Sequence, residues 1–437
     1  MWIQGALFCA RLPHLCTVKF DLIIIRKMKL KKGAGLKASI KTVMVIAILG
    51  LTTSAFGQWK IDSKFGKGIM NVVAADSSWS MKFGARFQTL FVGGVDLNDS
   101  LGAIGAESNF LIRRSRLKFD GFAFSPKLKY KMEFGLSNRD MSGAGPETKN
   151  TPRYILDAVV KWNFAGNWTL WAGQTKLPGN RERVISSGNL QFVDRSLVNS
   201  RYNIDRDMGI QLRHHFTIGE NFLIREIAAL SQGEGRNITA GNIGGYDWTG
   251  RVEFLPFGKF KSKGDYSSSD IKREETPKLA VGVTYDYHDR AVREQGNIKS
   301  FMYNDVGYYE TNINTIFADL MFKYKGFSLM AEYADKKADD PIAKNSDGTP
   351  TGDYVVEGTG LNVQLGYLLK NNLEISGRYT TINPTEEIGV EPTNMYTFGL
   401  SRYVVGHKLK VQSDISYTTQ EGSDDNLMYR LQIDLHF

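Results

Sequence analysis

Alternation of apolar and polar residues with a period of two is the feature that most constrains what this chain can fold into. Among residues 127–136, the charged residues Lys127, Lys129, Lys131 and Glu133 alternate with apolar ones. Because successive side chains of a β-strand point to opposite faces, such a segment has one apolar and one polar face. Comparable segments recur up to the C-terminus. At about ten residues they exceed the usual strand length and match a transmembrane strand.

These segments predict an all-β fold, a transmembrane antiparallel β-barrel of about 16 strands in residues 76–437. No stretch after Gln58 approaches the roughly 18 apolar residues of a transmembrane helix, so a chain that spans a membrane must close into a barrel. The predicted strands are residues 79–95, 110–124, 127–137, 153–164, 168–176, 207–217, 222–231, 247–257, 278–289, 313–325, 327–336, 357–370, 371–382, 394–405, 407–419 and 427–437.

The connectors between the predicted strands alternate between short and long. Tight turns are expected at 125–126, 165–167, 219–220, Gly326 and Gly406. Long polar loops are expected at 96–109, 138–152, 177–206, 232–246, 290–312 and 337–356. Short periplasmic turns and long outer loops are typical of an outer-membrane barrel. Residues 258–277 are an exception, because this long connector, rich in Lys, Ser and Glu, falls on the side of the short turns.

The start of the chain is predicted to be a leader. Residues 28–57 combine a basic beginning, a short apolar run and the small residues Ala55 and Gly57 at the end. This order is typical of a cleaved signal peptide, with cleavage expected near Gly57. Residues 1–27 are interpreted as upstream sequence from a mis-called start, and residues 58–75 as a short N-terminal segment before the barrel.

The positive charge of the chain does not indicate a nucleic-acid partner. The net charge is +9, but nine of the 55 basic residues and only one of the 46 acidic residues precede Gln58. The remaining body is nearly neutral, so any preference for anions must come from where the charges lie. Both cysteines, Cys9 and Cys16, also lie in the leader. The mature chain is therefore expected to have no disulfide, no thiolate metal site and no cysteine nucleophile.

The polar faces of several predicted strands carry rows of basic residues. The rows are Lys82 and Arg86, then Arg114, Arg116 and Lys118, and then Lys127, Lys129 and Lys131. In a barrel they would face a water-filled lumen and attract anions, while Arg113 would face outward or lie at the interface. Alternatively, the lumen charges only solvate the inner face and pair with Asp120, Glu133 and Asp157.

Residues that could carry chemistry are few. His214 and His215 are adjacent, so in a strand they point to opposite faces and cannot share a metal ion. The acidic run 335–353 could hold calcium, but a solvated outer loop is favoured. His288 and Asp289 at a strand end are a weak candidate for an outer-membrane barrel enzyme. We predict no catalytic residue, no metal site and no cofactor.

Several segments resemble the phosphate-selective porin O and P family. Residues 110–117 (FLIRRSRL) are similar to the arginine-rich second strand of that family. Residues 172–176 (AGQTK), 191–197 (QFVDRSL) and 207–209 (DMG) are similar to its fifth strand, its third loop and the start of its sixth strand. The terminal Phe437 matches the aromatic end that the barrel-insertion machinery reads in outer-membrane proteins.

The resemblance implies a porin of the bacterial outer membrane, usually a homotrimer, whose third loop, residues 177–206, folds inward to narrow the pore. The expected loop cations are Arg181, Arg183, Arg195 and Arg201. With Lys176 and the inner-wall rows they would form a path for small anions, phosphate or another oxyanion. Alternatives are a general or non-phosphate porin, a barrel enzyme, and a non-conducting adhesin or structural barrel, which would have fewer lumen charges and no inward loop.

Overall fold

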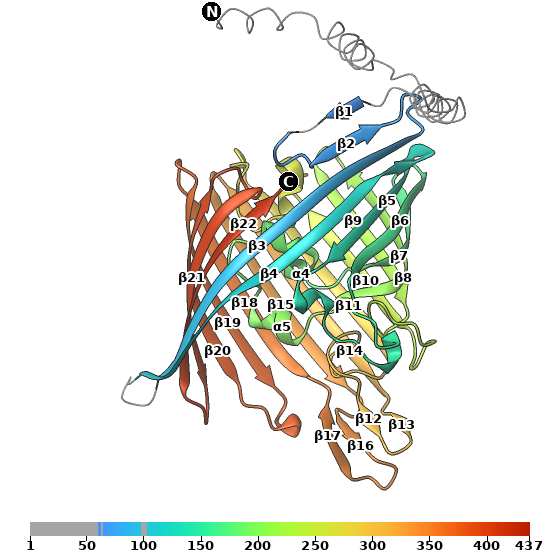
Figure 1. Ribbon diagram of the computed structural model, residues 1–437, viewed down its shortest axis with the longest axis vertical. Coiled ribbons are helices and arrows are strands. Elements are labelled where there is room, and N and C mark those ends of the chain that lie inside the picture. The colour runs from blue at the N-terminus through green and yellow to red at the C-terminus, as the bar shows by residue number, and fades with distance from the viewer. Residues whose placement is uncertain (1–59, 63, 98–102) are drawn as a thin grey trace, which may run out of the picture. The chain divides into compact units, whose positions relative to one another are not determined.

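The computed structural model describes residues 60–62, 64–97 and 103–437. The chain divides into two units, Met1–Gln58 and Trp59–Phe437, and all described residues lie in the second. The predicted leader, residues 1–57, lies outside them, so its processing stays a prediction. The main sheet of the second unit closes on itself, because β3 pairs with β4 along one edge and with β22 along the other (Figure 1).

Sixteen antiparallel strands form the closed barrel. They are β3 (Trp79–Leu97), β4 (Ala103–Ala123), β5 (Ser125–Gly135), β6 (Ile155–Ala165), β7 (Trp168–Lys176), β8 (Arg206–Ile218), β9 (Phe222–Ser231), β10 (Asp247–Leu255), β11 (Lys278–Ala291), β14 (Thr311–Tyr324), β15 (Phe327–Ala338), β18 (Gly358–Leu368), β19 (Leu373–Pro384), β20 (Thr393–Tyr403), β21 (Leu409–Gln420) and β22 (Asp425–His436). The predicted barrel is therefore confirmed.

Shorter elements lie outside the ring of barrel strands. Residues 58–75 contain β1 (Lys60–Asp62) and β2 (Met70–Val73), which pair with each other, and β2 also pairs with the start of β3. Two hairpins lie in long loops: β12 (Tyr303–Asn304) with β13 (Gly307–Tyr308), and β16 (Ile342–Lys344) with β17 (Pro350–Tyr354). The short helices are α3 (Asn138–Met141), η1 (Pro146–Thr148), α4 (Arg181–Val184), η2 (Ser187–Asn189), α5 (Leu197–Arg201), η3 (Lys261–Tyr266) and η4 (Glu386–Ile388). Such short elements are too brief to show a periodic pattern.

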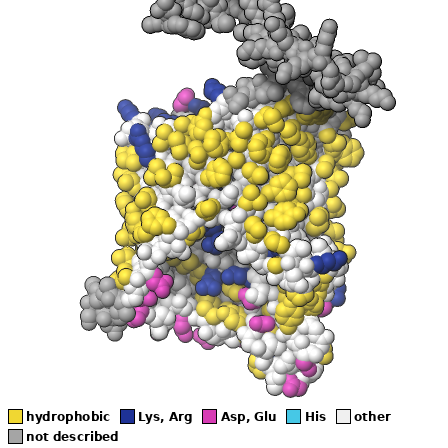
Figure 2. Space-filling model, viewed as in Figure 1, with side chains coloured by type: hydrophobic (Ala, Val, Ile, Leu, Met, Phe, Trp, Pro, Cys, Tyr) yellow, Lys and Arg dark blue, Asp and Glu magenta, His cyan; other side chains and the backbone are white. Residues whose placement is uncertain are grey.

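The outer wall of the barrel is apolar. Phe110, Trp162, Tyr285 and Phe398 are each more than half exposed. Figure 2 shows apolar side chains spread over the wall, with most of the charged side chains toward the two ends. Such a band suits a barrel in lipid, because hydrocarbon offers no partner to polar groups.

No helix in the described ranges is both long and apolar enough to cross a membrane.

The lumen is filled on one side and open on the other. Inward side chains of β11 to β21, such as Thr284, Glu332 and Lys410, are buried. Inward side chains of β5 and β6, such as Lys131 and Lys161, stay partly exposed. Much of the filling comes from two segments that enter the barrel, residues 177–206 and residues 258–277. The open space therefore lies along β4 to β8.

Candidate functional site: a basic cavity beside the constriction loop

Residues 177–206, here called the constriction loop, fold into the lumen as predicted. Arg181 Nε donates to Asp319 Oδ1 of β14 at 2.7 Å. The backbone N–H of Val193 donates to Asp414 Oδ2 of β21 at 3.0 Å. Because β14 and β21 are remote from the strands that carry the loop, these contacts fix it across the barrel.

Helix α5 of the constriction loop rests against the inner wall. Val198 and Tyr202 are fully buried in an apolar cluster that includes Phe317 of β14 and Ile382 of β19. Gly360 of β18 makes room for them, since a Cβ at this position would lie 3.0 Å from both the Val198 and the Tyr202 side chains. The absence of a side chain at this wall position lets the helix approach closely.

A cavity of about 860 Å³ remains between the constriction loop and the inner wall, most of it the wall of β4 to β8; we call it the basic cavity. Its described lining contains sixteen Lys and Arg side chains but only five Asp and Glu side chains. The basic residues are Arg113, Arg114, Arg116, Lys131, Arg139, Lys161, Lys176, Arg183, Arg195, Arg206, Arg213, Arg225, Arg236, Lys263, Arg378 and Arg430. The acidic residues are Glu133, Asp140, Asp157, Asp194 and Asp205.

Arg113 and Arg114 both enter the basic cavity although they are neighbours in β4. A β-bulge explains this, because the pairing with β3 skips Arg113: Gln88 faces Arg114, and the next residue of β3 faces Ile112. Arg113 Nη2 lies 2.6 Å from Asp194 Oδ2, and Arg114 Nη2 lies 3.2 Å from Asp194 Oδ1. The expectation that Arg113 faces outward or lies at the interface is wrong, since a strict period of two does not foresee a bulge.

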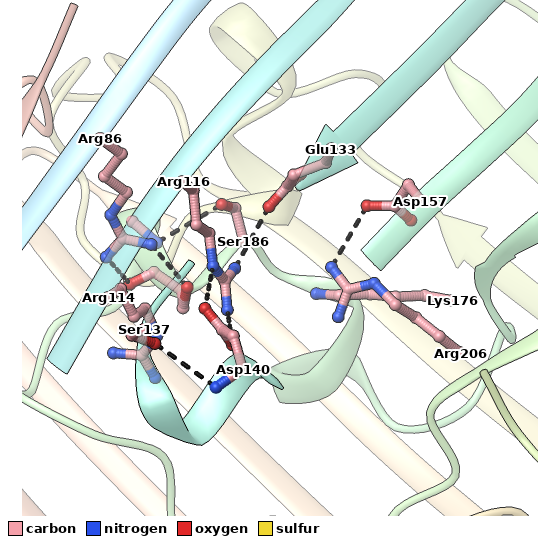
Figure 3. A network of polar contacts seen from close by, with 12 residues as sticks. Arg86, Arg114, Arg116, Glu133, Ser137, Asp140, Asp157, Lys176, Ser186 and Arg206 are labelled. Carbon is pink, nitrogen blue, oxygen red and sulfur yellow. Dashed lines mark hydrogen bonds and ion pairs between the residues drawn. The ribbon is translucent and has the colours of Figure 1, made fainter. Parts of the chain in front are cut away.

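Arg116 connects the wall to the loop after β5. Its Nε and Nη2 donate to the two carboxylate oxygens of Asp140 in α3, at 3.0 and 2.8 Å, and its Nη1 donates to Glu133 Oε1 at 3.2 Å. Figure 3 shows this guanidinium between the two carboxylates. Burial would raise the pKa of Asp140, but Arg116 outweighs it and brings that pKa to about 2.

Lys176 and Arg206 lie side by side where β7 ends and β8 begins (Figure 3). Asp157 of β6 serves two cations, because its Oδ2 is 3.2 Å from Arg206 Nη2 and 2.7 Å from Lys131 Nζ. Lys176 Nζ instead donates to a backbone carbonyl of the constriction loop, that of Arg183, at 2.5 Å. One carboxylate therefore offsets only part of the positive charge on this side.

Seven cavity cations have no carboxylate within 4.0 Å in the described part of the chain. They are Arg139, Lys161, Lys176, Arg195, Arg213, Arg236 and Lys263. Lys161 Nζ and Arg213 Cζ both lie over the Trp171 ring, 3.6 and 3.9 Å from its centroid. Cation–π contacts of this kind hold a positive charge in place without neutralising it.

The positive potential of the cavity is visible in the groups of the constriction loop. Burial would raise the pKa of Asp194, but Arg113 and Arg114 outweigh it and hold that pKa well below its usual range. Burial, together with the neighbouring cation Arg195, lowers the pKa of Arg183 well below its usual range. The pKa shift of Asp194 has the sign expected where negative charge is favoured, and the part of the Arg183 shift that comes from Arg195 has the sign expected where further positive charge is disfavoured.

The structure brings together six of the residues that the sequence predicted for the site. Those that line the basic cavity are Arg114, Arg116, Lys131, Lys176, Arg183 and Arg195. Those that do not line it are Lys82, Arg86, Lys118, Lys127, Lys129, Arg181 and Arg201. Lys127, Lys129 and Arg201 are exposed, and Lys118 pairs with Asp120 at 2.9 Å. Lys82 lies against Gly68, in the segment before the barrel.

Arg86 and Arg181 are anchors of the constriction loop. Arg86 is buried, pairs with Asp434 at 2.8 Å and donates to Ser187 Oγ at 2.6 Å. Arg181 is fully buried and pairs with Asp319 at 2.7 Å. The expectation that Arg181 faces the pore is wrong, because the loop turns this side chain into the wall.

Several cavity cations were missed by reasoning from the sequence. Lys161 and Arg213 lie on inward positions of predicted strands, so the alternation could have found them. Arg236 comes from the loop after β9, where no periodic pattern applies. Arg378 and Arg430 come from β19 and β22, whose closeness to β4 follows only from barrel closure and from the path of the constriction loop.

The residues suspected of chemistry lie apart from the cavity. His288 is buried on the inner face of β11, whereas Asp289 is beside Arg290, with a separation of 3.4 Å. The acidic run 335–353 overlaps the β16–β17 hairpin, and its Asp340 pairs with Lys344 at 2.9 Å. Within the described ranges, no three His, Cys, Asp or Glu side chains gather in a way that could hold a metal ion.

Known proteins resemble this chain in fold or in sequence. A barrel fold is shared with a loop L8 deletion mutant of OmpT, an outer membrane protein of Vibrio cholerae (TM-score 0.51, 10% identity, covering 82% of this chain and 100% of that one). It is also shared with the outer membrane channel DcaP of Acinetobacter baumannii (TM-score 0.50, 11% identity, covering 83% and 99%). An uncharacterized protein of Aquifex aeolicus (strain VF5) is 22% identical over 359 residues, which are 76% of this chain and 81% of that protein.

The family model that matches the chain is described as phosphate-selective porin O and P, and the match spans residues 82–427. This range begins in β3 and ends in β22, so it takes in nearly the whole barrel. The chain therefore belongs to the phosphate-selective porin O and P family and is an outer-membrane porin.

Proposed function

We propose that this porin is a passive channel, not an enzyme, and that it prefers small anions, with phosphate or another oxyanion as the favoured solute. The observation that carries the proposal is the lining of the basic cavity, with sixteen basic and five acidic side chains. A passage with such a lining concentrates anions and repels cations, because low-dielectric walls strengthen the field of the charges.

The preference arises from placement, since the body of the chain is nearly neutral. Acidic side chains that balance the total charge lie away from the cavity. Glu253 and Asp319 are buried behind the constriction loop, where Arg181 and Arg251 pair with Asp319 at 2.7 Å each. Neutral overall composition is thus compatible with a strongly positive passage.

Two kinds of cation line the basic cavity, and they suit two tasks. The paired arginines, such as Arg113 and Arg116, hold the constriction loop and α3 in place. Cations without a carboxylate, such as Lys161 and Arg213, remain available to a passing anion. Conduction needs contacts strong enough to concentrate the solute and weak enough to release it. An oxyanion can also accept two parallel hydrogen bonds from one guanidinium, which favours phosphate-like solutes at arginine.

The test is the double variant Lys161→Gln with Arg213→Gln, measured as reversal potential across a planar bilayer in a KCl gradient. Removing these two charges leaves no carboxylate unpaired in the described structure, so the barrel should fold normally. We expect the reversal potential of the unsubstituted protein to indicate a preference for chloride over potassium. The double variant should shift this potential toward the value expected for potassium. Phosphate added to the bath should reduce the chloride current of the full chain more than that of the variant.

The matched control is Lys127→Gln with Lys129→Gln, which removes the same charge from exposed positions outside the cavity. Its reversal potential should stay close to that of the full chain. A cation-side reversal potential for the full chain would refute the proposal. Equal shifts in the two double variants would show that net charge, and not the cavity lining, sets the preference.

A further inference from the structure

The connector between β10 and β11, residues 258–277, enters the barrel from the end that carries the short turns. Asp265 and Ser269 of the connector are buried and contact inward side chains of two distant strands. Arg225 of β9 pairs with Asp265, and Ser269 Oγ donates to Glu374 Oε2 of β19 at 2.7 Å. A segment that contacts inward side chains on separate walls lies within the lumen.

Lys323 of β14 holds this connector in place through hydrogen bonds. Its Nζ donates to the carbonyl oxygens of Gly264, Ser267 and Ser269 at 2.8, 2.8 and 2.7 Å. These bonds use all three ammonium donors of the lysine. Lys323 is almost fully buried, with 1% of its surface exposed, so it binds the connector and is not available to a solute.

The connector also interlocks with the constriction loop. Phe260 shares an apolar cluster with Ile185 and Leu190 of the loop. The backbone N–H of Ser268 donates to the carbonyl of Asn189 at 3.0 Å. Two segments that enter the barrel separately thus form one body against the wall of β9 to β21.

We propose that residues 258–277 form a plug that closes this half of the lumen from the periplasmic side, so that solutes pass only along the basic face of β4 to β8. The inference rests on the proposed function, because a plug matters only in a barrel that conducts. It goes beyond the proposed function because it names the part of the lumen that conducts and the segment that sets the width of the passage.

The plug also keeps acidic side chains away from the path. Glu253, Asp319 and Glu374 are inward-facing, and each is at most 5% exposed because the plug and the constriction loop cover them. Without the plug, solutes would meet part of this acidic wall. The plug therefore narrows the passage and sharpens its anion preference at the same time.

The experiment replaces residues 258–277 with Asn-Gly. Phe254 faces Val281 in the β10–β11 pairing, and the same register brings residues 257 and 278 together, where a two-residue Asn-Gly turn closes a hairpin. We expect a higher single-channel conductance, because the passage gains the space that residues 258–277 occupy, while the constriction loop stays in the lumen. The reversal potential should move toward the cation side.

A matched control trims residues 345–349, the tip of the β16–β17 hairpin, which projects from the end of the barrel in Figure 1. This change should alter neither conductance nor reversal potential. Unchanged conductance in the variant that lacks residues 258–277 would overturn the plug. If the shortened variant conducts more than the unsubstituted protein but the unsubstituted protein shows no anion preference, the plug stands and the proposed function alone is refuted.

A second measurement does not depend on conduction or on folding of the shortened chain. In a background with Cys9 and Cys16 replaced by Ser, the full-length chain carries either Ser268→Cys in the plug or Glu220→Cys in the exposed β8–β9 turn. A membrane-impermeant thiol reagent added to detergent-solubilised porin should label the residue 220 variant at least about tenfold faster, because labelling at a buried site requires local opening. Equal labelling rates would overturn the plug.

Discussion

Arg113 of β4 donates two hydrogen bonds to Asp194 of the constriction loop, through Nε at 3.1 Å and Nη2 at 2.6 Å to the same carboxylate oxygen. The contact exists because a bulge turns Arg113 into the lumen. The arginine-rich strand therefore has two roles: it holds the loop that narrows the lumen, and it contributes positive charge to the space that the loop leaves open.

The variant Arg113→Ala should loosen the constriction loop. Net stabilisation by hydrogen bonds to charged groups is about 1.5–3 kcal/mol, so we expect the free energy of unfolding to fall by about 2 kcal/mol. Urea titration of the folded barrel, followed by electrophoretic mobility, measures this change. Lys118→Ala removes a cation from the same strand but from an exposed pair, and it should cost less than about 1 kcal/mol. Equal losses in both variants would show that Arg113 does not anchor the loop.

The variant Arg116→Lys distinguishes the effect of the positive charge at position 116 from the effect of its hydrogen-bond geometry. Lysine keeps the positive charge of the basic cavity but cannot bridge Asp140 and Glu133 with a planar fork. We expect an unchanged reversal potential and a loss of roughly 1–2 kcal/mol in the free energy of unfolding. A large shift of the reversal potential with unchanged stability would contradict the contacts of Arg116 at 2.8 to 3.2 Å.

The pH dependence of the channel follows from the carboxylates that meet these arginines. The pKa of Asp140 is about 2, below its ordinary value of 3.8, so its stabilisation is present above pH 3.8 and is lost as the pH falls through about 2. Asp194 shifts in the same direction. The contacts that hold α3 and the constriction loop, and the current noise that arises when they break, should therefore stay constant from neutral pH down to about pH 4 and change only below it. Recording single channels over this range is the measurement, and an onset of noise near pH 5 would contradict it.

The barrel could be predicted from the sequence because a lipid-facing strand must alternate along its whole length. Each of the sixteen predicted segments overlaps a barrel strand, as 168–176 does with β7 (Trp168–Lys176). What the pattern could not show is the interior. Residues 258–277 stand out only as a long connector, since burial of Asp265 and Ser269 depends on Arg225 and Lys323, which come from other strands.

The site was predictable only where a regular strand or a short motif carried it. Arg114 and Arg116 follow the alternation of β4, and both line the basic cavity. Arg113 departs from it at a bulge, and Arg181 turns into the wall, because side-chain direction in an irregular loop depends on partners such as Asp319. Long-range contacts, not local pattern, decide which cation faces a solute and which one anchors the loop.

The variant Gly360→Val should displace helix α5 and change the shape of the basic cavity. A Cβ at Gly360 already lies 3.0 Å from the Tyr202 and Val198 side chains, so a branched side chain leaves α5 no room against β18. Overpacking of this kind costs about 1–3 kcal/mol, and the loop can relieve it by moving into the open space. We therefore expect a lower single-channel conductance in a barrel that still inserts into membranes. Gly377→Val is the control, because no atom lies within 4 Å of a Cβ at that position, and its conductance should match that of the full chain. If both valine variants conduct like the full chain, α5 does not border the conducting path.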